Sequence, residues 1–263
     1  MSRRIDLLRL DYAFSVIVPM LMAIYFNNLN LLDHLDIIIG FGFLAVTGNT
    51  LNDAIDMRDP KEEDTLERTK GYHWKEIATV GIITFVFGMM FFLRTIREHP
   101  INGVYLAASI IMVIVYCVKK DILIFNQILL GVSHVFFPYI MIKTDAGTIP
   151  VLSDIEWFLM ICFFSFAFTG NVVHEIIDGD SISRISLKGQ QLVVIISSCI
   201  TIGIGIVVLI VLKDLYFLPF VLIPIGSIYT FRKPTKSTRG VKDVGIILGN
   251  VIMVYFVLLI LMY

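Results

Sequence analysis

The stretch "TGNTLNDAID", Thr47 to Asp56, places amide and carboxylate side chains in an otherwise apolar part of the chain, and it has a partial copy 122 residues later. The copy is "TGNVVHEIID", Thr169 to Asp178. Five positions are identical, and Asp53 in the first stretch corresponds to Glu175 in the second. Two apolar segments therefore end in the same pattern of polar residues, which indicates an internal duplication.

The composition around these stretches is that of a membrane protein. Hydrophobic residues make up 57% of the 263 residues, charged residues only 16%, and the mean hydropathy is +0.85. The net charge of -1 argues against a nucleic-acid partner. The three cysteines lie in apolar runs without pairwise spacing, so neither a disulfide framework nor a zinc site is indicated. We expect one integral-membrane domain over residues 1–263.

Apolar runs near the length of a transmembrane helix recur along the whole chain. A spanning helix needs about 20 predominantly apolar residues. Nine stretches qualify or nearly do: 7–26, 35–56, 77–95, 102–118, 122–142, 157–178, 191–212, 215–231 and 244–262. The sequence thus predicts an all-α membrane protein with nine transmembrane helices in a bundle.

The basic residues fix the expected orientation of these spans. With the N-terminus in the cytoplasm, seventeen of the 21 Lys and Arg residues fall on the cytoplasmic side, in agreement with the positive-inside rule. Both polar stretches then lie at cytoplasmic ends, those of the second and sixth spans. We therefore expect two four-helix repeats of one orientation plus a ninth helix, in a multi-pass protein whose site faces the cytoplasm.

The polar stretches place amides and carboxylates along one face of each helix, because residues three, four and seven apart share a face. The first face carries Asn49, Asn52, Asp53 and Asp56. The second carries Asn171, His174, Glu175 and Asp178. Carboxylates at membrane depth persist mainly where they face a cavity, pair with cations or bind metal. Oxygen ligands without thiols suit Mg²⁺, which prefers to be shared between carboxylates and phosphate oxygens.

Basic residues near these helix ends could neutralise the phosphates. They are Arg68, Lys70, Lys119, Lys120, Arg184 and Lys188. The predicted ligand is therefore a diphosphate that carries a lipid tail. The alternative for either cluster alone is a set of solvated helix ends, and His134 in the fifth span is expected to be a hydrogen-bonded interior histidine.

The two polar stretches also resemble motifs of a known family, the UbiA superfamily of intramembrane prenyltransferases. "NDAIDMRD", Asn52 to Asp59, is similar to the first Asp-rich motif, although Pro60 stands where the family carries a further Asp. In the second motif, Asn171, His174 and Asp178 occupy the positions of an acid, a Tyr or Lys, and an Asp.

Two further segments carry the resemblance. "LERTKG" matches the family's "NRPLxxG" at Arg68 and Gly71. "YCVKKDILIFNQILLG", Tyr116 to Gly131, is similar to the family's "YSxxLKRxxxxxN" stretch. The positions matched there are Tyr116, Lys119, Lys120 and Asn126.

The resemblance implies a nine-helix bundle with a central cavity open to lipid, in which Mg²⁺ holds a polyprenyl diphosphate. Loops 57–76 and 179–190 would cap the cavity. The expected catalytic residues are Asp53, Asp56, Glu175 and Asp178. The expected metal ligands are Asn52, Asp56, Asp59, Asn171, Glu175, Asp178 and Asp180. The expected substrate-binding residues are Asn52, Arg68, Lys119, Lys120, Asn126, His174, Arg184 and Lys188.

The reaction implied is Mg²⁺-dependent transfer of a prenyl group to a lipophilic acceptor in the membrane. That acceptor would be an aromatic quinone or haem precursor, or a glycerol-phosphate lipid precursor. Three alternatives stay open: a membrane terpene cyclase of the same fold that needs no acceptor, a cation or small-anion transporter, and an inactive lipid-binding relative. Few ionisable residues lie in the outer halves of the second and sixth spans, which argues against the transporter.

Overall fold

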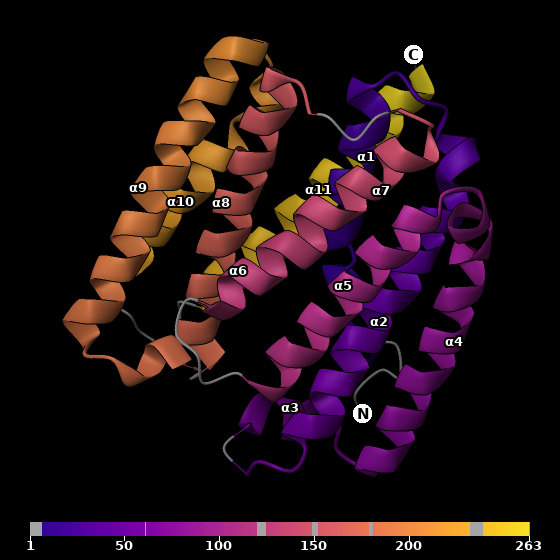
Figure 1. The fold of residues 1–263 in the computed structure, drawn as a ribbon. Coiled ribbons are helices and arrows are strands. Elements are labelled where there is room, and N and C mark those ends of the chain that lie inside the picture. The colour runs from indigo at the N-terminus through magenta and orange to yellow at the C-terminus, as the bar shows by residue number, and fades with distance from the viewer. Residues whose placement is uncertain are drawn as a thin grey trace.

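The computed structural model describes residues 7–60, 62–119, 125–148, 152–178, 181–231 and 239–262, and every regular element in these ranges is a helix. The expected all-helical class is therefore confirmed. In Figure 1 the helices form a bundle, with α3 at one end and the end of α11 at the other.

The elements follow one another without a sheet. The longer helices of the first half are α1 (Phe14–Phe26), α2 (Leu35–Asp56), α3 (Glu63–Arg68), α4 (Trp74–Glu98) and α5 (Pro100–Val118). Those of the second half are α6 (Phe125–Gly131), α7 (Phe137–Asp145), α8 (Asp154–Asp178), α9 (Leu187–Leu212), α10 (Pro219–Phe231) and α11 (Arg239–Met262). The short 3₁₀ turns are η2 (Leu10–Tyr12), η3 (Leu31–His34), η5 (Ser181–Arg184) and η6 (Leu215–Phe217), and a π-helical turn, η4 (Val132–Phe136), joins α6 to α7.

Seven helical segments are long and apolar enough to cross a membrane, so the chain is an integral multi-pass membrane protein. The segments are Leu31–Asp56, Trp74–Glu98, Pro100–Val118, Phe125–Asp145, Asp154–Ile177, Leu187–Leu212 and Gly245–Met262. Two expected spans correspond to shorter apolar helices, Leu10–Phe26 and Pro219–Phe231. The first begins with a 3₁₀ turn, and the second ends where residues 232–238 leave the described part of the chain. The count of nine spans stays a prediction.

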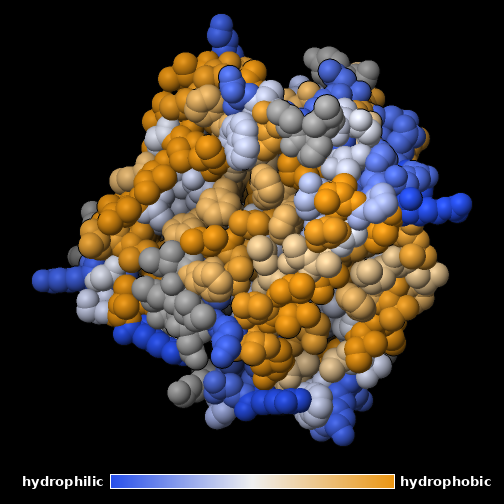
Figure 2. All heavy atoms as spheres, in the orientation of Figure 1, coloured by the Kyte–Doolittle hydropathy of each residue, from blue (hydrophilic) through white to orange (hydrophobic). Residues whose placement is uncertain are grey.

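The surface agrees with burial in a bilayer. Figure 2 shows hydrophobic side chains over the middle of the molecule and hydrophilic ones gathered toward its two ends. Ile82, Met90, Ile111 and Ile210 are each at least 60% exposed, which would be costly in water but suits contact with lipid chains.

Helix α1 is the central element of the bundle. The side chains from Met20 to Ile24 are consecutive, and each is at most 1% exposed. A helix that is buried all round must be enclosed by other helices, and α1 contacts α7, α11, α2 and α8. The segment that precedes α1 is thereby held at one end of the bundle interior.

The helix pairs α2–α4 and α8–α9 each have a contact between two threonine hydroxyl groups. Small residues allow α2 and α4 to approach closely, since a Cβ atom on Gly88 would lie 3.2 Å from the carbonyl oxygen of Gly40. The hydroxyl oxygens of Thr47 and Thr84 lie 3.0 Å apart between α2 and α4. Those of Thr169 and Thr201 lie 3.0 Å apart between α8 and α9. Thr47 and Thr169 are each the first residue of a duplicated stretch.

Candidate functional site

A cavity of about 710 Å³ lies inside the bundle and receives side chains from both duplicated stretches. Its apolar walls include Val16, Phe41, Phe163 and Phe166. Part of its polar lining comes from the C-terminal halves of α2 and α8. The polar residues from these two helices are Thr47, Asn49, Asn52, Asp56, Thr169, Asn171, His174 and Glu175. The two clusters that the sequence predicts on separate helices thus border one cavity.

The first stretch divides its polar residues between the cavity and the protein. Asn52 donates from Nδ2 to Asp56 Oδ2 at 2.7 Å, and both residues line the cavity. Asp56 is only 6% exposed. The amide oxygen of Asn52, Oδ1, is buried and has no hydrogen-bond partner among the described residues. A buried acceptor without a partner beside a carboxylate is a suitable position for a cation.

Asp53 differs from its neighbours because it does not line the cavity. It is fully buried and accepts two hydrogen bonds from Arg68 of α3, from Nη2 to Oδ1 at 2.7 Å and from Nε to Oδ2 at 3.2 Å. Arg68 itself reaches the cavity, together with Thr65 and Glu62 of the same segment. The Asp53 carboxylate therefore fixes the segment 57–76 over the end of α2.

The second stretch offers a similar arrangement on α8. Glu175 is 6% exposed and accepts a hydrogen bond at 2.7 Å from Gln127 Nε2 of α6. Gln127 Oε1 is buried without a hydrogen-bond partner among the described residues. Asn171 and His174 line the cavity, and the His174 ring lies 6.1 Å from the ring of Tyr12. Asp178 is the last residue of α8, and its side chain lies outside the described part of the structure.

Five of the remaining predicted residues are described by the structure and do not line the cavity. Asp59, Lys119, Arg184 and Lys188 are exposed, and the buried Asn126 is also outside the cavity lining. Lys120 and Asp180 lie outside the described residues. Their roles stay predictions.

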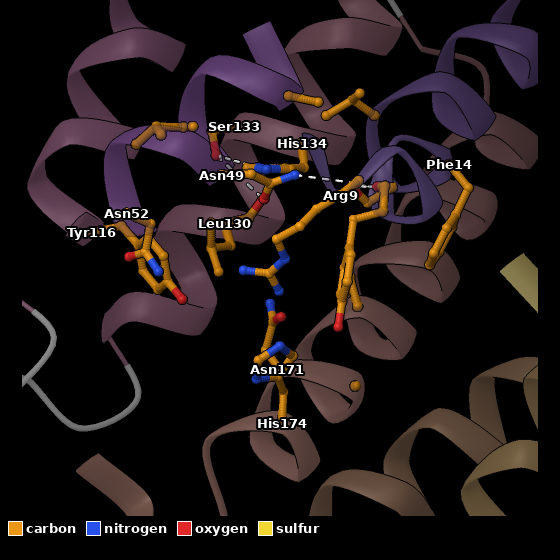
Figure 3. Close-up of a pocket in the computed structure, with 18 of the residues that line it drawn as sticks. Arg9, Phe14, Asn49, Asn52, Tyr116, Leu130, Ser133, His134, Asn171 and His174 are labelled. Atoms are coloured by element: carbon orange, nitrogen blue, oxygen red, sulfur yellow. Dashed lines mark hydrogen bonds between the residues drawn. The ribbon is translucent and has the colours of Figure 1, made fainter. Parts of the chain in front are cut away.

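Arg9 also lines the cavity, although in the sequence it counts only among the basic residues that predict the orientation of the spans. It precedes η2 and lines the cavity beside Tyr12, with its Cζ atom 4.4 Å from the centre of the Tyr12 ring. Its carbonyl oxygen accepts a hydrogen bond from Asn49 Nδ2 at 3.3 Å. In Figure 3 the Arg9 side chain extends from this contact toward Asn171 and His174. No pattern in the sequence before α1 indicated that Arg9 would line a cavity.

A π-helical turn brings His134 to the cavity wall. His134 Nδ1 lies 2.8 Å from Ser133 Oγ, and the Ser133 carbonyl oxygen accepts from Ser109 Oγ at 3.1 Å. Figure 3 shows the Ser133–His134 contact at the cavity wall. His134 is hydrogen-bonded in the interior, as expected, but it also faces the cavity. π-helical turns are frequent at functional sites.

The cavity contains a donor set that fits Mg²⁺. Asn52 Oδ1, Asp56 and Glu175 supply oxygen atoms only, and the buried Asn52 oxygen lacks a protein partner among the described residues. A separate group at the other end of the bundle, Glu98, His99 and Asp145, brings potential ligand atoms within 4.8 Å of one another. Arg94 donates to Glu98 and Asp145 at 3.1 and 3.0 Å, so both carboxylates of that group already have a cationic partner.

Comparisons with known proteins were made by sequence and by structure. No family model and no curated protein sequence matches the chain. Among solved structures, a digeranylgeranylglyceryl phosphate synthase, a UbiA-superfamily intramembrane prenyltransferase, matches with a TM-score of 0.56 and 16% sequence identity, over 98% of this chain and 95% of that one. The chain therefore shares the overall fold of that synthase, in agreement with the fold that the resemblance of its motifs implied.

Proposed function

We propose that this protein transfers a prenyl group from a polyprenyl diphosphate to a lipophilic acceptor within the membrane. The observation that carries the proposal is the convergence of Asn52 and Asp56 from α2 with Asn171 and Glu175 from α8 on one apolar cavity. A diphosphate attached to a hydrocarbon chain needs both a polar end that binds metal and an apolar chamber. The fold of the solved prenyltransferase structure supports the same conclusion.

The proposed reaction starts with the diphosphate bound between the two clusters. Bound Mg²⁺ would supply Lewis-acid stabilisation of the departing pyrophosphate. Asn52, Asp56 and Glu175, with Asp178, would hold the ion. Arg68 would contact phosphate oxygens from α3. When the C–O bond to the diphosphate breaks, its electron pair leaves with the pyrophosphate, so the allylic carbon becomes cation-like and open to attack by the acceptor.

The segment 57–76 would also exclude water from the reacting carbon. Thr65 and Arg68 of α3 line the cavity, and the bond between Arg68 and Asp53 ties α3 to α2. Exclusion of water matters because hydrolysis would otherwise quench the cation. The loop 179–190 would act in the same way beside α8, where Ile182 is fully buried against Val172 and Val173.

We further propose nine spans in two four-helix repeats, with the N-terminus and the site facing the cytoplasm. The paired threonines at Thr47–Thr84 and Thr169–Thr201 support the repeat, since each joins a duplicated stretch to the next long helix. The distribution of Lys and Arg supports the orientation.

The test is product analysis with purified protein. Geranyl, farnesyl and geranylgeranyl diphosphates are each supplied with Mg²⁺, alone and with aromatic and glycerol-phosphate acceptors, and the products are identified by mass spectrometry. We expect a prenylated acceptor and pyrophosphate, both abolished by EDTA. A cyclic product without acceptor would replace the proposal with a terpene cyclase. Tight binding of the diphosphate without any product would identify an inactive lipid-binding relative, and metal flux into vesicles without turnover would identify a transporter.

A further inference from the structure

Arg9 has a backbone conformation that is costly for a residue with a side chain. Its φ and ψ angles are both 45°, and only two other non-glycine residues in the described ranges, Asn28 and Lys213, have a positive φ. Such conformations persist where the surroundings hold them in place. Two hydrogen bonds do so here: the Arg9 carbonyl oxygen accepts from Asn49 Nδ2 at 3.3 Å and from the Tyr12 backbone N–H at 3.1 Å.

The guanidinium of Arg9 lies largely inside the protein, yet its nearest carboxylate is already occupied. The side chain is 14% exposed, and Arg9 Nη1 lies 3.7 Å from Asp53 Oδ1, which is longer than a hydrogen bond. Asp53 is held by Arg68 at the shorter distances of 2.7 and 3.2 Å. A guanidinium is not deprotonated in proteins. Arg9 therefore stays charged.

Arg9 also lies between equivalent positions of the two repeats. Asn49 and Asn171 are 122 residues apart, the offset of the duplicated stretches, and both line the cavity. Figure 3 shows the Arg9 side chain leading from Asn49 toward Asn171. A guanidinium carries five N–H donors in a planar fork that matches phosphate and carboxylate oxygens. A role limited to pairing with Asp53 would not explain its entry into the cavity, because Arg68 already neutralises that carboxylate.

We propose that Arg9 binds a phosphate or carboxylate oxygen of a substrate at the centre of the cavity, between the two repeats. The proposal rests on the proposed function and adds a specific anion contact from the segment before α1. The anion has two possible sources, the diphosphate of the prenyl donor and an acidic group on the acceptor.

The first experiment needs no variant. The wild-type protein is labelled with phenylglyoxal, which modifies arginines, and Arg9 is followed by peptide mass spectrometry. Inorganic pyrophosphate with Mg²⁺ represents the donor, and glycerol phosphate and benzoate represent acceptor headgroups. We expect at least one of these anions to protect Arg9, and the anion that protects it identifies the source. Arg58 is the internal control, because it is exposed and stacks on Trp74 at 3.9 Å away from the cavity lining. Equal labelling of Arg9 with and without all three anions would overturn the proposal.

The second experiment compares Arg9→Gln and Arg9→Lys with the control Arg58→Gln. We expect Arg9→Gln to weaken binding of the protecting anion about 10- to 100-fold, as loss of a charged hydrogen bond requires. Arg9→Lys keeps the charge but not the fork, so it should be intermediate. Arg58→Gln and the binding of uncharged farnesol should be unchanged. Wild-type anion affinity in a folded Arg9→Gln protein would also overturn the proposal.

These readouts separate the anion site from the reaction. If the wild-type protein gives no prenylated product but Arg9 is protected by an anion, the proposed function is wrong and the anion site is right. If product forms while Arg9 labelling and anion affinity are unaffected, the reverse holds. Arg9→Gln is expected to fold, because Asp53 keeps both hydrogen bonds to Arg68.

Discussion

The guanidinium of Arg68 holds both carboxylate oxygens of Asp53, with Nη2–Oδ1 at 2.7 Å and Nε–Oδ2 at 3.2 Å. This pair connects α3 to the last turn of α2 and sets the position of the segment over the cavity. Asp53 is fully buried, whereas the Arg68 side chain is 23% exposed. The bond therefore has a structural role at the edge of the proposed active site.

Replacement of Arg68 by Gln should destabilise the protein through Asp53. The buried carboxylate would keep only the 3.7 Å contact with Arg9, and removal of one partner of a buried ion pair costs about 3 kcal/mol or more. The free energy of unfolding in detergent is the measurement. The double variant Arg68→Gln/Asp53→Asn should regain most of the loss, since the buried negative charge is removed together with the guanidinium that holds it. Equal destabilisation of the single and double variants would contradict this account.

Replacement of Asp56 by Asn should abolish turnover and leave the fold intact. The change removes the negative charge but keeps the size of the side chain and its capacity to hydrogen-bond Asn52, which lies 2.7 Å away. Loss of a residue that only hydrogen-bonds to a metal ligand costs about 10- to 100-fold in metal affinity or activity. Loss of a direct ligand such as Asp56 should therefore exceed that range. Asp154→Asn, at the exposed start of α8, is the control. A wild-type rate for Asp56→Asn would remove Asp56 from the site.

Replacement of Gln127 by Met should raise the Mg²⁺ concentration needed for half-maximal activity. Gln127 Nε2 donates to Glu175 at 2.7 Å and so orients that carboxylate. Methionine has a similar volume but no donor, and loss of such an orienting bond weakens metal sites about 10- to 100-fold. Turnover at saturating Mg²⁺ should recover to near the wild-type value. A rate that stays low at every Mg²⁺ concentration would show that Gln127 acts in another way.

The sequence predicts the apolar helices and the polar face at the end of each duplicated stretch, because both follow from periodicity along a single helix. At about 100° per residue, Asn49, Asn52 and Asp56 fall within a narrow stripe, and Asp53 falls at the edge of that stripe. These three residues do line the cavity. Asp53 is turned toward Arg68 instead. The sequence of α2 alone does not predict which neighbouring helix a residue at the edge of this stripe will contact.

Two features of the site depend on contacts that are distant in sequence. Arg9 reaches the cavity because Asn49 and Tyr12 hold the backbone before α1 in an unusual conformation. His134 faces the cavity because a π-helical turn interrupts the rod from α6 to α7, and Ser109 on α5 accommodates the displaced carbonyl group of Ser133. In both cases the hydropathy of the sequence predicts a membrane span but not the local departure from α-helical geometry.

A buried ion pair at the other end of the bundle gives a prediction that concerns stability alone. Lys143 Nζ of α7 donates to both oxygens of Glu156 of α8, at 2.7 and 2.8 Å, and Tyr139 and Asn27 also donate to Glu156. Lys143→Met should therefore lower the free energy of unfolding by about 3 kcal/mol or more, because Glu156 would stay buried with neutral partners only. Glu156→Gln added to Lys143→Met should recover part of this loss but not all of it. Tyr139 and Ser153 donate to different oxygens of Glu156, and the glutamine nitrogen that replaces one of these oxygens cannot accept a hydrogen bond. Turnover per folded molecule should be unchanged in both proteins, and a selective loss of turnover would show that this ion pair is coupled to the cavity.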